Sequence, residues 1–190
     1  VKGGQGAAVN VESNGKLIIE GGDFSNSNTE AVLISKADET ATVEVKGGSF
    51  VGYDPTESVP AGSAVYSTTD DNNVTTYHVV EGTVVKTAEA FKNAVENLGG
   101  EITVAGSFDL SNLGVVYVKH DANIHVLEGA VINTMRQGSY ANIVINEGVS
   151  VNLDGEGEFK TVGTGEFDTN SNRIIDINGK LVLNGCKFTQ

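Results

Sequence analysis

The chain of 190 residues has no tryptophan, one cysteine, one methionine and two prolines. A lone Cys186 excludes a framework of intramolecular disulfides. Lysine and arginine number only 12 against 25 acidic residues, which gives a formal net charge of −13. Such a chain lacks the basic stripe that a nucleic-acid groove needs, and anionic membranes repel it. No apolar run approaches the roughly 18 residues of a membrane-spanning helix, so insertion into a membrane is excluded as well.

Glycine, in contrast, is abundant, with 24 residues, and hydrophobic residues make up 39% of the chain. The glycines do not follow the three-residue period of collagen, and the apolar content argues against a wholly disordered chain. Many of them belong to a repeated segment, in which a short alternating strand leads to a glycine turn and then a phenylalanine. Its copies are residues 16–24, 42–50, 100–108, 149–159 and 180–188.

Further short strands are predicted between these copies. They cover residues 9–11, 32–34, 116–118, 124–127, 143–145 and 175–177. Their alternation of apolar and polar residues indicates one buried and one solvated face. Phe24 and Phe50 are 26 residues apart, and Phe159 and Phe188 are 29 apart. Three short strands with their turns fill such a length.

Two all-β architectures suit this pattern. An antiparallel sandwich or jelly roll joins its strands by tight hairpins. A parallel β-helix, or β-solenoid, repeats similar residues once per coil and stacks them on one another. The constant order of strand, glycine and phenylalanine favours the solenoid. We therefore expect glycines at corners that need positive φ, and Phe24 stacked on Phe50.

One amphipathic helix interrupts the strands at residues 87–100. Ala88, Phe91, Val95 and Leu98 lie on one predicted face. The segment starts with Thr87, a good N-cap residue, and stops at Gly99–Gly100, where glycine is typical of a helix C-terminus. Because solenoid ends need caps, this short helix is expected to cover one open end.

The helix suggests a boundary between two stacked solenoid units. Residues 1–82 are expected to end a first β-helix, with an exit hairpin from strands 64–67 and 75–80. Residues 83–190 are expected to start a second, helix-capped β-helix. The sequence begins within a glycine turn and stops soon after Phe188. This asymmetry suggests a segment of a longer chain, or ends that partner chains cover.

Residues 87–108, a small helix, Gly-Gly, a strand and a glycine turn, resemble the start of the right-handed parallel β-helix of the pectin-lyase-like superfamily. The coils at 149–159 and 175–188 fit that pattern. The first segment is similar to glycine-rich β-helix repeats of surface proteins of gut Bacteroidales and of virion proteins of their phages. In those repeats, Gly-Gly-x-Phe coils end in a segment like residues 50–55 here. The resemblance implies a right-handed fold and an extracellular, cell-surface or virion location.

No catalytic cluster stands out, and no catalytic or cofactor-binding residue is predicted. Asp168, Asn170 and Asn172 place oxygen atoms at alternate positions, as a calcium loop does. However, Arg173 takes the place of the turn glycine, and Gly179 that of the final glutamate. These three residues are weak metal candidates, and an ordinary polar corner is the alternative reading.

The acidic clusters, the histidines and the cysteine are expected to have structural rather than catalytic roles. Acidic residues gather at 154–158 and at 166–168, where solvated turns are expected rather than a glycosidase pair. His125 is expected to point outward beside a strand, and a zinc pair with His120 is the alternative. Cys186 is expected to be a buried, inert thiol.

Three functions remain. The leading hypothesis is a non-enzymatic structural or interaction module of a bacterial surface or phage protein, with other protein chains as partners and a homotrimer as one form. The alternatives are a fragment of a polysaccharide lyase or glycosidase and a glycan-binding adhesin. The absence of tryptophan weakens the case for a strong sugar platform.

Overall fold

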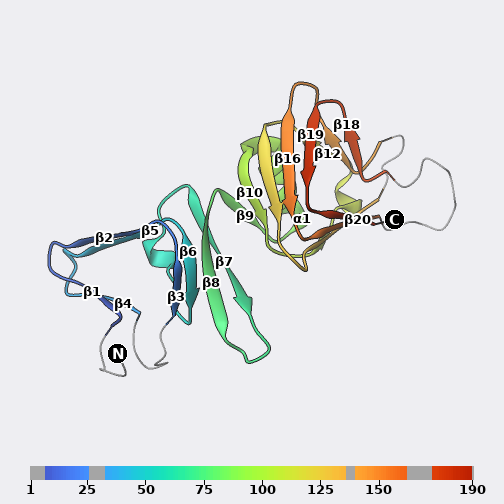
Figure 1. Cartoon of the computed structure of the whole chain (residues 1–190). Coiled ribbons are helices and arrows are strands. Elements are labelled where there is room, and N and C mark those ends of the chain that lie inside the picture. The colour runs from blue at the N-terminus through green and yellow to red at the C-terminus, as the bar shows by residue number, and fades with distance from the viewer. Residues whose placement is uncertain (1–6, 26–32, 136–139, 162–172, 190) are drawn as a thin grey trace. The chain divides into compact units, whose positions relative to one another are not determined.

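In the computed structural model, residues 7–25, 33–135, 140–161 and 173–189 are described. The fold is a parallel β-solenoid of about six turns. It divides into two compact units, Val1–Gly82 and Thr83–Gln190 (Figure 1). The predicted solenoid is therefore confirmed, and the antiparallel sandwich is wrong for the coils, because consecutive coils pair parallel.

Unit 1 contains two coils of three strands each. The first coil consists of β1 (Val9–Val11), β2 (Lys16–Ile19) and β3 (Asp23–Ser25). The second consists of β4 (Ile34–Lys36), β5 (Thr42–Val45) and β6 (Gly48–Val51). Each strand of the first coil pairs parallel with its counterpart in the second. The strand predicted at 32–34 is shifted toward the C-terminus, because pairing with β1 aligns Val9 with Ile34.

The second coil leads into a hairpin. After the short helix η1 (Thr56–Ser58), strands β7 (Ser63–Thr69) and β8 (Thr75–Glu81) pair antiparallel. Strand β8 also pairs antiparallel with β6, so the hairpin extends one sheet of the solenoid. Asp70 closes the turn by accepting hydrogen bonds from the backbone N–H groups of Asn72 and Val74. The predicted hairpin is confirmed.

Unit 2 stacks its coils into three parallel sheets. One contains β9 (Thr83–Val85), β10 (Gly100–Val104), β13 (Ala122–Val126), β16 (Ser150–Gly155) and β19 (Lys180–Asn184). The second contains β11 (Phe108–Asp109), β14 (Val131–Thr134), β17 (Glu158–Thr161) and β20 (Lys187–Thr189). The third contains β12 (Val116–Val118), β15 (Ile143–Ile145) and β18 (Ile175–Ile177). Strands β16 and β19 lie side by side in Figure 1, and β13 separates β16 from β10.

Rows of similar apolar side chains fill the interior of each unit. Phe24 stacks on Phe50, with ring centroids 4.9 Å apart and an angle of 5° between the planes. Phe159 stacks on Phe188 in the same way, at 5.4 Å and 11°. Side chains of a strand point alternately inward and outward, so every second residue of each strand belongs to these interior rows. Both stacks follow the repeat that the sequence predicts.

Glycines form the corners where the interior leaves no room for a side chain. Gly22 and Gly48 have φ values of 112° and 119°, a region that favours glycine. Gly155 combines a φ of 101° with close packing, since a Cβ atom there would lie 2.1 Å from the carbonyl oxygen of Val126. The glycine-rich composition therefore reflects tight corners in stacked coils.

The predicted helix forms and packs into the interior of unit 2. Helix α1 (Ala88–Asn93) continues as the π-helical turn η2 (Ala94–Leu98). The Thr87 side chain accepts a hydrogen bond from the N–H of Ala90, as expected for an N-cap. Phe91 is buried and contacts Phe108, with ring centroids 5.6 Å apart.

The prediction that Leu98 belongs to the buried face is wrong, because its side chain is 56% exposed. A π-helical turn has more residues per turn than an α-helix. The wider turn at 94–98 therefore rotates Leu98 away from the face that carries Phe91 and Val95.

Candidate functional site

The outer face of the sheet β10–β13–β16–β19 carries two rows of mostly polar side chains, of which Thr103 is buried and Val182 is apolar. Strand pairing aligns Glu101, Asn123, Asn152 and Val182 in one row, and Thr103, His125, Asp154 and Asn184 in the other. The neighbouring residues Ile124 and Leu153 point inward and are buried. The alternation that fills the core therefore also places amides and charged groups side by side on the outside.

A shallow groove of about 400 Å³ lies at the start of these strands. Its lining is mixed, with polar residues Asp121, Asn123, Ser150, Asn152 and Lys180 beside apolar ones such as Val182. Asn123 donates a hydrogen bond of 2.6 Å to Glu101, and Asp121 accepts one of 2.8 Å from the backbone N–H of Ser150. Amides and carboxylates held in this way offer donors and acceptors to a polar ligand.

An exposed acid–base pair lies on the same face. His125 Nδ1 is 2.6 Å from Asp154 Oδ1, and the two side chains are 52% and 37% exposed. His125 points outward, as the sequence predicts. Asp154 does not lie in a solvated turn, however, because β16 continues through Gly155 and strand pairing holds Asp154 opposite His125. Such an exposed pair contributes about 1 kcal/mol or less to stability.

A second histidine site lies on the sheet of unit 1. His78 forms hydrogen bonds with the Ser49 hydroxyl through Nδ1 and with the Thr68 hydroxyl through Nε2, both at 3.1 Å, one ring nitrogen donating and the other accepting. Its ring stacks on Tyr66. Burial lowers the pKa of His78, although the charge of Asp23 opposes the shift. Because hydroxyl groups occupy both ring nitrogens, the pair of Ser49 and His78 lacks the carboxylate that orients the base in a serine triad.

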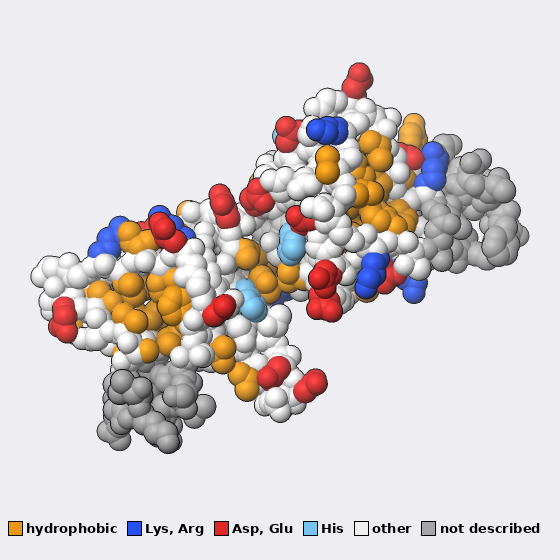
Figure 2. Space-filling model, in the orientation of Figure 1, with side chains coloured by type: hydrophobic (Ala, Val, Ile, Leu, Met, Phe, Trp, Pro, Cys, Tyr) orange, Lys and Arg blue, Asp and Glu red, His pale blue; other side chains and the backbone are white. Residues whose placement is uncertain are grey.

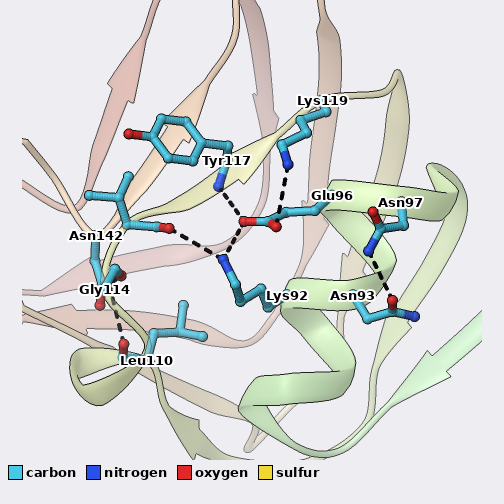
Figure 3. A network of polar contacts seen from close by, with 10 residues as sticks. Lys92, Asn93, Glu96, Asn97, Leu110, Gly114, Tyr117, Lys119 and Asn142 are labelled. Carbon is cyan, nitrogen blue, oxygen red and sulfur yellow. Dashed lines mark hydrogen bonds and ion pairs between the residues drawn. The ribbon is translucent and has the colours of Figure 1, made fainter.

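A polar network joins the helix to the coils of unit 2 (Figure 3). Glu96 forms an ion pair with Lys92, lies 3.5 Å from Lys119 Nζ and accepts a hydrogen bond from the N–H of Tyr117. Burial raises the pKa of Glu96, but the hydrogen bonds from Lys92 and Tyr117 and the two lysine charges outweigh it, so the pKa is lowered. Glu96 thus holds η2 against β12.

Asn142 belongs to the same region and is fully buried. Its amide nitrogen donates to the carbonyl oxygens of Leu110 and Gly114, and its amide oxygen accepts from the N–H of Met135. Figure 3 shows Asn142 beside Leu110 and Gly114. The bonds satisfy backbone groups at a corner of the coil. Asn142 is therefore a structural residue.

The other predicted site residues have separate environments. Asp168, Asn170 and Asn172 lie outside the described residues, as do Glu166 and the rest of that acidic stretch. His120 lies beside Gly99 at the end of η2, while His125 pairs with Asp154. Cys186 is half-buried, donates to the carbonyl oxygen of Asp154 at 2.9 Å, and has a pKa that burial raises. In the described part of the chain, no three His, Cys, Asp or Glu side chains come together to hold a metal ion.

The groove and the His78 site are not apparent in the sequence. Their residues come from different coils and meet only through strand register, as Ser49 meets His78 between β6 and β8. A repeat alignment that fixed the register would have placed Asn123 beside Asn152. Within the described ranges, no helix is both long and apolar enough to cross a membrane.

Comparison with protein-family models, curated proteins and solved structures gives no significant match. The strand pairing shows a β-solenoid fold. Because no comparison matches, the resemblance to the pectin-lyase-like superfamily and to Bacteroidales repeats stays a prediction.

Proposed function

We propose that this chain is a non-enzymatic structural and interaction module, a β-solenoid segment of a bacterial surface protein or of a phage virion protein. The observation that carries the proposal is the regular stacking of the coils, with Phe24 on Phe50 and Phe159 on Phe188. Coils that stack in register add stability through each neighbouring interface, which suits a spacing or presenting element. The extracellular location rests on the resemblance of the Gly-Gly-x-Phe coils.

Enzyme assays test this proposal. The purified chain is incubated with a panel of acidic and neutral polysaccharides, and new reducing ends and unsaturated products are measured. We expect no product. Product formation that the His125→Ala substitution abolishes would contradict the structural role and favour a polysaccharide-active enzyme, because His125 and Asp154 form the exposed acid–base pair of the outer face.

A glycan-binding adhesin is the second candidate, and the groove beside Asn123 and Asn152 favours it. Amide and carboxylate groups fixed on a rigid sheet match the hydroxyl groups of a sugar. A glycan array tests this function. The adhesin function predicts a signal that Asn152→Ala removes and that Asn72→Ala, in the turn of the hairpin, leaves unchanged.

The module is proposed to act in contact with other protein chains. The mass of the chain in solution tests this part of the proposal. A homotrimer would be the closed form expected of a fibre, and a strict monomer would contradict the contact with further copies.

A further inference from the structure

Strand β7 forms a long free edge in the middle of the chain. The sheet order is β3–β6–β8–β7, so β8 covers one side of β7, and among the described residues no strand pairs with its other side. With seven residues each, β7 and β8 are the longest of the described strands. Such an edge offers a row of backbone N–H and C=O groups to another strand.

The hydrogen bonds of the hairpin show which backbone groups of β7 point away from β8. Gly82 donates its N–H to the carbonyl oxygen of Gly62, and Asp70 donates its N–H to that of Val74. Hydrogen-bonded pairs alternate along an antiparallel ladder, so the even-numbered residues of β7 direct their backbone groups toward β8. The odd-numbered residues direct theirs to the free edge, and these are Ser63, Val65, Ser67 and Thr69.

The edge carries none of the features that usually keep sheet edges apart. Charged side chains, proline and bulges protect the edge strands of natural sheets. All seven residues of β7 are uncharged and none is proline, and the register with β8 runs from Ser63 to Thr69 without a bulge. The acidic side chains visible at the tip of the hairpin in Figure 2 lie beyond the end of β7. Another strand can therefore approach this edge.

The outer face of the sheet ends in an aromatic ring at the same edge. Strand pairing aligns one row, which consists of Asp23, Ser49, His78 and Tyr66. The ring of Tyr66 stacks on that of His78, with centroids 4.7 Å apart and an angle of 19° between the planes. Because this stack crosses from β8 to β7, the opposite face of the Tyr66 ring is directed toward the free edge.

We propose that β7 pairs antiparallel with β7 of a second copy of this chain, about a two-fold axis that passes beside Tyr66. The inference names the partner of the proposed interaction module and rests on that function. A two-fold contact uses the same strand of both copies and closes on itself, so it gives a dimer and nothing larger.

An axis at Tyr66 matches the outward backbone groups of the two strands. Val65 lies opposite Ser67 of the second copy, and both residues offer their N–H and C=O groups to one another. Ser63 lies opposite Thr69 of the second copy. The N–H of Ser63 is already bonded to the carbonyl oxygen of Pro60, 3.2 Å away, so this pair gains one bond, from the N–H of Thr69 to the carbonyl oxygen of Ser63.

The side chains on the axis are compatible as well. Tyr66 lies opposite Tyr66 of the second copy in a non-hydrogen-bonded pair, the kind in which facing side chains are closest. Aromatic pairs at such positions stabilise antiparallel sheets. The row of rings that starts at His78 is therefore continued across the axis by the same two rings of the other copy.

Charge favours the antiparallel arrangement over a parallel one. Asp70 and Asp71 lie in the turn of the hairpin, between β7 and β8. Antiparallel pairing sets Asp70 opposite Gly62 of the second copy and keeps the two acidic turns at opposite ends of the shared sheet. Parallel pairing would bring both turns together, where their carboxylates repel each other.

Sedimentation velocity over a dilution series tests the proposal with the full chain. We expect the mean mass to rise with concentration and to level off at twice the mass of one chain. The net charge of −13 repels two copies at long range, so salt is expected to strengthen the dimer.

Ser67→Pro tests the edge itself. Ser67 is exposed and its N–H faces outward, so proline leaves the bonds between β7 and β8 in place while it removes a donor from the free edge. This variant is expected to lose the dimer. Ser67→Ala keeps the N–H and is the matched control, which is expected to associate like the unchanged chain. Circular dichroism establishes that both variants are folded.

Cysteine substitution tests the register and does not depend on the proline variant. Tyr66→Cys places two thiols opposite each other at about 4.5 Å between Cα atoms, within the range of a disulfide. Oxidised glutathione is expected to link this variant into a covalent dimer. Ala64→Cys is the control, because Ala64 lies opposite Thr68 of the second copy and several residues from its own counterpart. Both variants keep Cys186, so a link formed by Cys186 would appear in both.

Several results would overturn the proposal. They are a monomer at all concentrations, a mass that passes beyond the dimer, and equal linking of Tyr66→Cys and Ala64→Cys. A dimer that survives Ser67→Pro would overturn the pairing through β7 and leave the contact with further copies standing. Polysaccharide cleavage is measured separately, and it would overturn the structural role while leaving the dimer intact.

Discussion

Asn142 shows what one polar side chain does inside a coil. Its three hydrogen bonds go to backbone groups of three different residues at a buried corner. Asn142→Ala removes these hydrogen bonds at a buried corner, so we expect unfolding of unit 2 to become easier by about 2–3 kcal/mol. Chemical denaturation of the variant measures this. Asn97→Ala, at an exposed helix position, is the control, and an equal loss in both variants would contradict the role of Asn142.

Glu96 makes the stability of unit 2 depend on pH. Its pKa is lowered from the ordinary value of 4.5 in the folded chain. Its contribution is therefore complete above pH 4.5 and is lost as the pH falls through the lower folded-state pKa. Glu96→Gln removes this dependence, so the difference in unfolding free energy between the two chains is expected to shrink from pH 7 to acid.

Denaturation curves at a series of pH values test this expectation. Glu89→Gln, at an exposed position of the first helical turn, serves as the control for the loss of one carboxylate on the same helix. A difference between Glu96→Gln and the unchanged chain that stays constant down to acid pH would contradict the ion-pair network.

Single residues were predictable where the repeat fixed their environment. The stacking of Phe24 on Phe50 follows from their equal places in two copies of one segment. The partners of Asn142 and His78 were not predictable, because they depend on which coils meet and on turn conformations that carry no sequence signature. The prediction that Leu98 is buried is wrong for a local reason. The π-helical turn changes the direction of its side chain, and the spacing of apolar residues does not reveal that turn.

At the scale of elements, the helix of residues 88–98 anchors unit 2 through Phe91. This ring is 1% exposed and contacts Phe108. Phe91→Ala leaves a cavity, and we expect a loss of about 3–5 kcal/mol in the unfolding free energy of unit 2. Leu98→Ala, on the same helix, is expected to change it by about 0.5 kcal/mol or less. Thermal unfolding compares the two, and equal melting temperatures would refute the anchoring role.

The corner after β16 depends on glycine. At Gly155, φ is 101° and a Cβ atom would lie 2.1 Å from the carbonyl oxygen of Val126. Gly155→Ala is therefore expected to destabilise unit 2 by several kcal/mol, of which about 1–2 come from the left-handed backbone alone. Gly21→Ala is the control, since a Cβ atom there meets nothing within 4 Å. Denaturation that is unchanged by Gly155→Ala would mean that this corner has another shape.

At the scale of the whole molecule, the order of strands and the hairpin were predictable, because the repeat has one strand pattern per coil. The order of the repeats predicts which strands pair, whereas parallel pairing leaves no turn signature of its own in the sequence. The outer groove could not be predicted from the sequence, because Asn123 and Asn152 become neighbours only when β13 pairs with β16.

The central claim is that consecutive coils pair parallel and in register. Nuclear Overhauser contacts between backbone protons of β13 and β16 test it directly in the isotope-labelled chain. We expect contacts between the amide and α protons around Ile124 and Leu153, without the short contacts between α protons that mark antiparallel pairs. Strong α-proton contacts between these strands, or pairing of strands adjacent in sequence such as β10 and β11, would contradict it.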